Sequence, residues 1–390
     1  MTSEPDISEF NLFDPHTAAN LVELFTRARA ECPVARSEKN GGYYLVTRYE
    51  DCVAVGRDWE TFASDRGRDI PPRPVTPMPP IHTDPPIQRD YRKLLNPFFS
   101  PKTVAEYEPQ MHDVAARLVE KLAQKNSAEW IEEFAAALPA AVLSEMILNL
   151  DDPAEVDFAL KSVYRVTHDM SEEAHHALAD YVGSMLRSPK LPSIDRSGVL
   201  TAVVNGSVDG RPLTFQEQVG VVVLLIEGAL DTTKATLGSI LLRVAQRPEL
   251  EQRLRDPGWI RTDLDEFFRY DSAVIGHGRK VTKRTVLNGQ QLEEGDLVLV
   301  CWNSANRDES KFPNAHELDF ERESNPHLTF GLGPHRCIGL NLARLTIKVA
   351  FEEVLARLTN FRLAEGFEEV WATGPSRQLT RLDVTYEVLS

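Results

Sequence analysis

One cysteine, Cys337, lies in a glycine-rich stretch from Phe330 to Gly339, directly before a segment of helical character at 341–358. Glycines in such a stretch let the backbone turn sharply and approach a flat, bulky group closely. The free N–H groups and the dipole of a helix N-terminus favour an anion at this point. Because His335 and Arg336 add cationic or donor groups, we expect Cys337 to be a thiolate. A thiolate among such donors would be a soft metal ligand.

The fixed positions of this stretch form the pattern Phe-Gly-x-Gly-x-His-x-Cys-x-Gly. Without further context, a cysteine near a helix start is more often a small buried residue. The whole pattern, however, resembles the heme-binding loop of the cytochrome P450 superfamily, the heme-thiolate monooxygenases. The resemblance implies that Cys337 is the axial iron ligand of heme b (iron protoporphyrin IX), where a thiolate favours O–O cleavage. It also implies that Phe330, His335 and Gly339 contact the heme.

A second informative segment, residues 215–247, is predicted to be one long helix. Its first half, residues 219–226, is apolar on all sides and should be buried. This run leads directly into Glu227 and Asp231, and buried acids are costly unless they are paired or used. Glu227 could pair with Asp231 one turn away, or it could meet a polar group of the substrate.

Residues 228–233 resemble the oxygen-binding helix of the same superfamily, with its small-small-x-acid-Thr-Thr pattern, although Ala229 stands where a glycine is frequent. The resemblance implies that Asp231 and Thr232 deliver protons to dioxygen at the iron. A threonine hydroxyl that bonds a backbone carbonyl would also open a groove in the helix. Three residues at i, i+4 and i+8 share the face that we assign to the heme and the substrate pocket: Leu224, Gly228 and Thr232.

The start of another predicted helix, at 84–92, carries Gln88 and Arg92 on one face. A guanidinium matches a carboxylate in bidentate fashion, although an arginine on a helix usually faces solvent. The resemblance implies that Gln88 and Arg92 bind one heme propionate, and that Arg279 and His335 help to neutralise the propionates.

Glu266 and Arg269 lie one helical turn apart. The resemblance implies that they form a structural triad with Arg322, which supports the loop-rich segment before the cysteine. It also places Val274 and Ile275 at the substrate, so that the predicted pocket consists of Leu224, Glu227, Gly228, Val274 and Ile275. The small or apolar members of this set favour a hydrophobic substrate of modest size, such as a terpenoid or an aromatic compound.

The elements that must position these residues are mostly helical. We predict helices at 17–31, 49–56, 101–125 and 130–150, and a helical hairpin at 154–187 that breaks near 169–171. The resemblance makes this hairpin a mobile lid over the substrate channel, and makes the proline-rich loop at 70–86 a cover for the distal side of the heme. We expect the histidines at 175 and 176 to face solvent. Strands are predicted at 43–47 and 379–388, with a hairpin turn at Asn288 and Gly289.

Composition limits the class of protein. The chain has 390 residues, of which 42% are hydrophobic and 26% charged, as in ordinary globular proteins. Without linkers or repeats, residues 1–390 should form a single domain. The net charge of −16 argues against nucleic acid as a partner. No apolar run approaches the roughly eighteen residues of a membrane span, no signal peptide is visible, and the four scattered cysteines fit a reducing cytoplasm.

Electrons must come from outside the chain, because it has neither a glycine-rich dinucleotide-binding motif nor a cysteine set for an iron–sulfur cluster. The resemblance therefore implies a separate ferredoxin and its reductase, supplied by NAD(P)H. A basic patch that could dock the ferredoxin consists of Arg89, Lys93, Arg336, Arg344 and Lys348. Alternatively, these are ordinary solvated charges.

The sequence thus predicts a mainly α fold with a small β portion, the single-domain heme-thiolate monooxygenase fold. The expected reaction inserts one atom of O2 into a C–H bond or a double bond of a hydrophobic substrate. One alternative is a family member that couples phenols or uses peroxide, although such variants often lack the acid–alcohol pair. Another is a non-enzymatic heme gas sensor, which would need neither a proton relay nor a lid.

Overall fold

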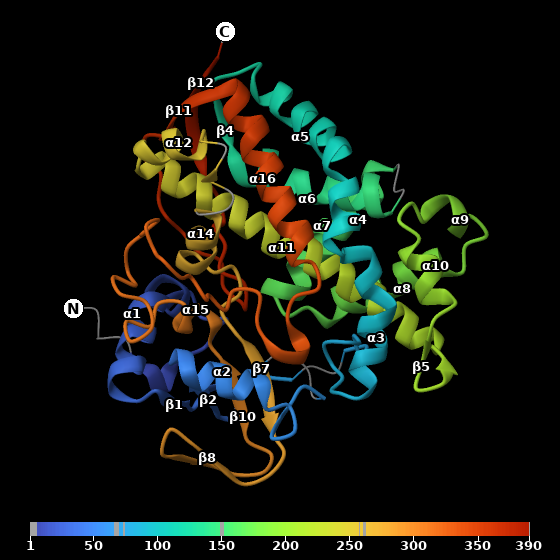
Figure 1. Cartoon of the computed structure of the whole chain (residues 1–390), viewed down its shortest axis with the longest axis vertical. Coiled ribbons are helices and arrows are strands. Elements are labelled where there is room, and N and C mark those ends of the chain that lie inside the picture. The colour runs from blue at the N-terminus through green and yellow to red at the C-terminus, as the bar shows by residue number, and fades with distance from the viewer. Residues whose placement is uncertain are drawn as a thin grey trace.

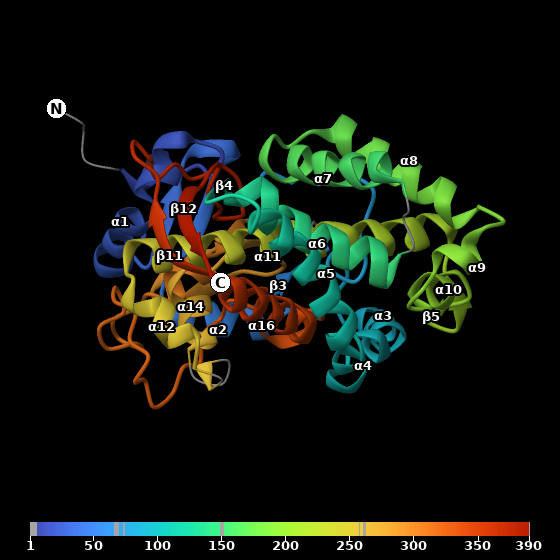
Figure 2. The same cartoon turned by 90° about the horizontal axis from the view of Figure 1, so that it is seen from above.

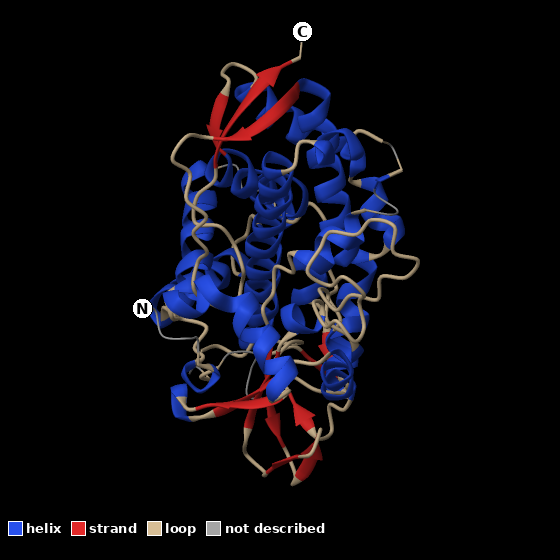
Figure 3. Ribbon diagram, turned by 90° about the vertical axis from the view of Figure 1, so that its left-hand side faces the viewer, coloured by secondary structure: helices blue, strands red, loops and turns tan. Residues whose placement is uncertain are grey.

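The computed structural model describes residues 6–65, 70–72, 75–148, 152–256, 258–259 and 263–389. Most of the chain is helical, and the strands gather in small sheets at opposite ends of the molecule (Figures 1 and 3). The predicted mainly α fold with a small β portion is therefore confirmed. None of the described helices is both long and apolar enough to cross a lipid bilayer.

The α-helices in chain order are α1 Pro15–Glu31, α2 Tyr49–Arg57, α3 Ile87–Leu95, α4 Pro101–Glu106, α5 Glu108–Leu122, α6 Ala137–Val142, α7 Pro153–His168, α8 Glu172–Leu186, α9 Leu191–Ile194, α10 Val199–Val204, α11 Phe215–Gln246, α12 Glu249–Leu254, α14 Leu264–Tyr270, α15 Trp302–Ala305 and α16 Leu340–Arg357. The strands are β1 Val34–Ser37, β2 Tyr43–Val46, β3 Phe62–Ala63, β4 Ser127–Glu129, β5 Ser207–Val208, β6 Arg211–Pro212, β7 His277–Val281, β8 Thr285–Leu287, β9 Gln290–Leu292, β10 Leu297–Val300, β11 Leu358–Leu363 and β12 Asp383–Val388.

The larger sheet has the order β1-β2-β10-β7-β3, with β10 parallel to β2 and the other pairs antiparallel. A three-stranded sheet, β11-β12-β4, lies at the end of the molecule where the chain terminates (Figure 1). The predicted turn at Asn288 and Gly289 joins β8 to β9, with φ of 48° and 80° at the two residues. Both values suit the type I′ turn that such a pair favours.

Helix α11 runs through the middle of the molecule (Figures 1 and 2). Thr214 and Glu217 form a capping box at its start, which satisfies free N–H groups there. Its first half belongs to one hydrophobic cluster and its second half to another, because the helix is apolar around nearly its whole circumference. The proline-rich segment passes so close to α11 that a β-carbon on Gly220 would be 2.0 Å from the carbonyl oxygen of Pro77.

Two helical predictions differ from the structure. The expected helix at 101–125 is broken at Tyr107, since Pro109 is tolerated only in the first turn of the new helix α5. The expected helix at 130–150 contains π-helical segments at Ile131–Ala136 and Leu143–Ile147 on either side of α6. Residues 149–150 of that prediction lie outside the described residues.

The predicted helical hairpin is present as α7 and α8, joined at 169–171, and it lies along α11 (Figure 2). Met170 has φ of 52° at this turn, and the Ser171 side chain caps α8. The expectation for the two histidines was half wrong: His176 is exposed, but His175 is completely buried. Adjacent helical residues point about 100° apart, so only one of the two can face solvent on a packed helix.

Candidate active site

The cysteine loop is closed by its own backbone. Gly331 and Gly333 have φ of 62° and 66°, values that a residue with a side chain rarely adopts. The N–H of Cys337 donates to the carbonyl of Phe330 over 2.8 Å, and Gly339 is the N-cap of α16. The loop therefore presents Cys337 at the start of a helix, as predicted.

Cys337 has exposed surface. Burial raises the pKa of its thiol, while the N–H of Gly339 and the charges of Arg92 and Arg336 lower it. The thiolate expected from the sequence stays a prediction, and a bound metal cation would favour the deprotonated form.

A stripe of accessible residues interrupts the buried surface of α11. Leu224, Gly228 and Thr232 retain accessible surface while most of their neighbours are buried. A β-carbon on Gly228 would have no atom within 4 Å, and the hydroxyl of Thr232 donates to the carbonyl of Gly228 over 3.1 Å. Ile338, next to the cysteine, packs against the same hydrophobic cluster as Leu224. The cysteine loop and the accessible stripe of α11 therefore both adjoin this hydrophobic cluster.

Asp231 is buried beside this stripe and held by two partners. Its Oδ1 lies 3.2 Å from His168 Nε2, at the end of α7, and accepts from Gln378 Nε2 over 2.9 Å. Burial alone would raise the pKa of Asp231, but the hydrogen bond and charge of His168, with help from Lys234 and Ser376, lower it to about 2. The carboxylate is therefore ionised at neutral pH.

Glu227 does not lie in the accessible stripe, so its predicted contact with substrate is wrong for this structure. Its side chain is buried, and Oε1 lies 3.6 Å from Nδ1 of His175 on α8. Glu227 points about 100° away from Gly228 on the helix, so the two residues cannot both face the accessible stripe. The pairing of Glu227 with Asp231 stays a prediction.

A cluster of cationic groups lies near the cysteine loop. Arg279 on β7 is buried, and burial lowers its pKa to about 10 while Asp84 raises it. Arg92 on α3 donates to the carbonyl of Arg336 over 2.9 Å, and burial lowers its pKa while Cys337 raises it. His335 Nε2 lies 3.2 Å from Asp84 Oδ1; burial and the two arginines lower its pKa.

Neither Arg92 nor Arg279 forms an ion pair with a carboxylate within the described part of the chain, although Arg279 is buried and a buried guanidinium is costly without an anion. The cluster is therefore suited to an anionic group. Gln88 is buried and donates to the carbonyl of Pro334 over 2.5 Å, so its amide holds the cysteine loop.

The structure brings Glu266, Arg269 and Arg322 together. Glu266 accepts from Arg269 over 2.6 and 2.8 Å and from Arg322 over 3.1 and 3.2 Å. Arg269 also donates to the carbonyls of Asn306, Ala315 and Glu317. The loop-rich segment is thus tied to α14. Phe330 packs edge-on to Phe268 of the same helix, with ring centroids 4.9 Å apart.

Of the two apolar residues before β7, only Val274 keeps accessible surface. Ile275 is buried in a different cluster, with Phe10, Phe25 and Leu45, and its predicted contact with substrate is wrong. Successive residues of an extended chain point to opposite sides, so both could not line one pocket.

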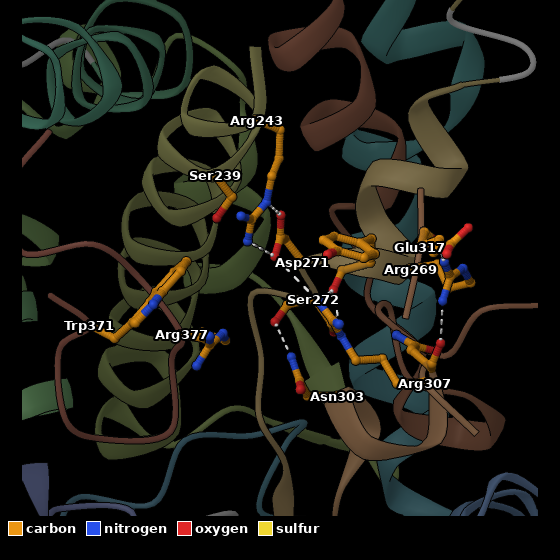
Figure 4. A network of polar contacts seen from close by, with 12 residues as sticks. Ser239, Arg243, Arg269, Asp271, Ser272, Asn303, Arg307, Glu317, Trp371 and Arg377 are labelled. Carbon is orange, nitrogen blue, oxygen red and sulfur yellow. Dashed lines mark hydrogen bonds and ion pairs between the residues drawn. The ribbon is translucent and has the colours of Figure 1, made fainter. Parts of the chain in front are cut away.

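Sequence reasoning missed the polar network behind the site (Figure 4). Arg243 on α11 forms a bidentate pair with Asp271, and Arg307 lies 3.7 Å from the same carboxylate. Burial alone would raise the pKa of Asp271, but the charges of Arg243, Arg307 and Arg377 keep it below its ordinary value. Arg377 also stacks over the ring of Trp371 at 4.0 Å. No local spacing in the sequence predicts these contacts or the contacts of His168 and Gln378 with Asp231.

Comparisons with known proteins agree with this geometry. A family model described as "Cytochrome P450" matches residues 262–373. The probable cytochrome P450 127A1 of Sinorhizobium fredii is 33% identical over 362 residues, which cover 90% of this chain and 85% of that protein. The nocardicin C N-oxygenase of Nocardia uniformis is 31% identical over 402 residues, covering 98% of this chain and 99% of the relative.

A comparison with solved structures also finds a cytochrome P450. The solved structure of cytochrome P450 CYP109Q5 from Chondromyces apiculatus superposes with a TM-score of 0.87 at 28% identity, covering 99% of this chain and 100% of that one. This chain therefore belongs to the cytochrome P450 family and is a heme-thiolate monooxygenase.

Proposed function

We propose that the chain inserts one oxygen atom from O2 into a C–H bond or a double bond of a small-to-medium hydrophobic molecule, with heme b held by Cys337. The observation that carries this proposal is the desolvated yet accessible cysteine, which adjoins the same core region as the accessible stripe of α11. When bound, the heme supplies the iron at which dioxygen is reduced and from which one oxygen atom is transferred.

The residues present fit a heme with its two carboxylate side chains. Among the described residues, neither the partly buried Arg92 nor the buried Arg279 pairs with a carboxylate. Both would bind the propionates, with His335 beside them. The empty space over Gly228 leaves room for a bulky flat group. Phe330 and Gly339, which flank the cysteine within its loop, would border the same group.

Thr232 and Asp231 have different roles in handling protons. The Thr232 hydroxyl is on the accessible stripe and donates to the backbone of Gly228. Its lone pairs therefore remain available to accept a hydrogen bond. Asp231 is ionised and buried one residue away. We assign Asp231 the task of receiving protons from the protein interior and Thr232 the task of passing them into the pocket.

The pocket residues left by the structure are apolar or small: Leu224, Gly228 and Val274. They support a hydrophobic substrate such as a terpenoid or an aromatic compound, because apolar lining with few polar groups favours apolar ligands. We also propose that residues 1–390 act as one heme domain. The four cysteines are free thiols, which supports a reducing cytoplasm.

The electron donor proposed here is a ferredoxin with a reductase that uses NAD(P)H. Within the predicted basic patch, Lys93, Arg344 and Lys348 each contact a carboxylate of this chain. Arg89 and Arg336 remain exposed, and we propose these two as the docking charges, since unpaired charges steer association most effectively.

The test combines the carbon monoxide spectrum of the reduced protein with the yield of product per NAD(P)H consumed. The reduced protein with carbon monoxide should show the red-shifted thiolate band, and Cys337→Ala should lose it. Thr232→Ala should lower the product formed per NAD(P)H consumed. Thr236→Ala is the matched control, because its hydroxyl also bonds a carbonyl four residues back but is buried. An unchanged product yield in Thr232→Ala would refute the proton role.

A further inference from the structure

Two buried contacts join the helical hairpin to α11. His168 ends α7 and His175 lies on α8, while their partners Asp231 and Glu227 lie one turn apart on α11. The four side chains are almost fully buried. Both contacts pair an imidazole of the hairpin with a carboxylate of the helix that carries Thr232. They therefore fix the hairpin against α11, along which it lies in Figure 2.

The ring of His168 is the more constrained of the two. Its Nδ1 lies 2.6 Å from the carbonyl oxygen of Thr373. A carbonyl oxygen only accepts, so Nδ1 must carry a proton. Nε2 then faces Asp231 Oδ1 at 3.2 Å and also contacts the amide nitrogen of Gln378.

Asp231 can accept a hydrogen bond in either protonation state of the His168 ring. A neutral ring has a lone pair at Nε2, and the amide of Gln378 must then bridge that nitrogen and Asp231. A protonated ring donates directly to Asp231 instead. In both states His168, Gln378 and the Thr373 carbonyl together fix where Asp231 points.

The other contact behaves differently. Within the residues that the structure describes, neither ring nitrogen of His175 has a hydrogen-bond partner, and its Nδ1 is 3.6 Å from the Glu227 carboxylate. This distance allows attraction between charges but exceeds a hydrogen bond. His175 therefore holds the hairpin more loosely than His168 does, and the directional contact to Asp231 is the one that orients a catalytic group.

We propose that His168 is a positioning residue for Asp231, and that seating of the α7–α8 hairpin on α11 is what orients this carboxylate for proton transfer. The inference rests on the proton role proposed above for Asp231. The other groups that face the pair are the ring of Tyr164, 4.8 Å from the His168 ring, the Lys234 charge and the Ser376 hydroxyl.

The two nitrogens of His168 allow a sharp test in the holoenzyme. His168→Gln keeps a donor near the position of Nε2, and His168→Asn keeps one near the position of Nδ1. We expect His168→Asn to lower product per NAD(P)H by about tenfold, within the range of general acid–base effects, and His168→Gln to retain most of it. His176→Gln is the matched control, because that histidine is exposed on the same hairpin.

Two further readouts separate positioning from a structural role. Hydrogen exchange of the α7–α8 amides in the carbon monoxide complex should be faster in His168→Asn and in Asp231→Asn, and no faster in the double variant than in either single one. Rescue by the conservative variant is the second readout, because His168→Gln should keep the exchange of the α7–α8 amides close to that of the unmodified protein.

Equal behaviour of His168→Asn, His168→Gln and His176→Gln in yield and exchange would overturn the proposal. Asp231→Asn probes the same contact from the other side if His168→Asn does not fold. A missing thiolate band in the unmodified protein would refute the heme-thiolate function instead, and hydrogen exchange would still decide whether the contact between His168 and Asp231 holds the hairpin.

Discussion

Gly333 of the cysteine loop lies against the end of α2, so closely that a β-carbon on Gly333 would be 2.4 Å from the carbonyl oxygen of Gly56. Backbone atoms cannot yield as a flexible side chain can. The position of the cysteine loop is therefore set by contact with α2 as well as by its own turns.

From this contact we predict that Gly333→Ala displaces the loop. The variant combines left-handed strain at φ of 66° with a steric clash, and should lose about 2–4 kcal/mol of unfolding free energy. The thiolate band of the carbon monoxide complex should fall with it. Gly210→Ala is the control, since Gly210 has φ of 71° but no atom within 4 Å of its β-carbon position. Equal losses in the two variants would contradict the role of the contact.

Glu266→Gln should be among the most destabilising substitutions of a charged residue. Glu266 is buried and neutralises Arg269 and Arg322, so its loss leaves two buried guanidinium groups without a counter-charge. Breaking such a buried pair costs about 3–5 kcal/mol. Chemical denaturation measures the loss, with Glu293→Gln of the exposed pair with Arg284 as control, for which we expect about 1 kcal/mol or less. A loss for Glu266→Gln as small as that would show that Arg269 and Arg322 are sufficiently stabilised by backbone carbonyls.

Local spacing was enough to predict the backbone arrangement of two parts of the candidate site. The cysteine loop and the stripe of Leu224, Gly228 and Thr232 follow from residues close in sequence, because turn chemistry and the helical period act over a few residues. The buried state of α11 also followed from its apolar first half. The position of Arg279 came only from resemblance to the family.

The partners of the site residues could not be predicted, since they come from distant segments. Asp231 meets His168 and Gln378, 63 and 147 residues away, and no periodicity encodes such a meeting. The family resemblance misled us at Ile275, where alternation along an extended chain should have separated it from Val274. The desolvation of Cys337 could not be predicted either, because it depends on the whole surrounding fold.

Arg279→Met should have opposite effects on two quantities. The guanidinium is buried and has no carboxylate partner among the described residues. An apolar side chain should therefore leave the heme-free protein as stable or stabilise it by about 1–4 kcal/mol. Heme retention should weaken by about tenfold or more, because a hydrogen bond to a charged group contributes about 1.5–3 kcal/mol. Denaturation of the heme-free form and transfer of heme to an acceptor protein measure the two effects.

The exposed Arg284 provides the control, since Arg284→Met should change neither quantity appreciably. A destabilised heme-free protein with unchanged heme retention would show that Arg279 serves the fold rather than an anionic ligand. This outcome would remove one support for the proposed propionate site.

The capping box of α11 should make stability depend on pH in acid. The hydrogen bond from Arg211 lowers the pKa of Glu217 to about 2, burial opposes this shift, and Thr214 and Tyr91 assist it. A carboxyl group whose pKa is lower in the folded than in the unfolded state contributes stability above about pH 4.5, and this contribution is lost as the pH falls toward 2. Glu217→Gln should therefore reduce unfolding free energy by about 1–2 kcal/mol at pH 7.

The difference in unfolding free energy between Glu217→Gln and the unmodified protein should shrink steadily from pH 4.5 downward. Protonation of Glu217 removes the same negative charge that the substitution removes. Denaturant unfolding at several pH values between 3 and 7 measures this difference. Glu38→Gln, in an exposed pair with Arg36, should show a small difference at every pH. A difference for Glu217→Gln that stayed constant down to pH 3 would mean that the cap acts through shape and hydrogen bonding alone, without its charge.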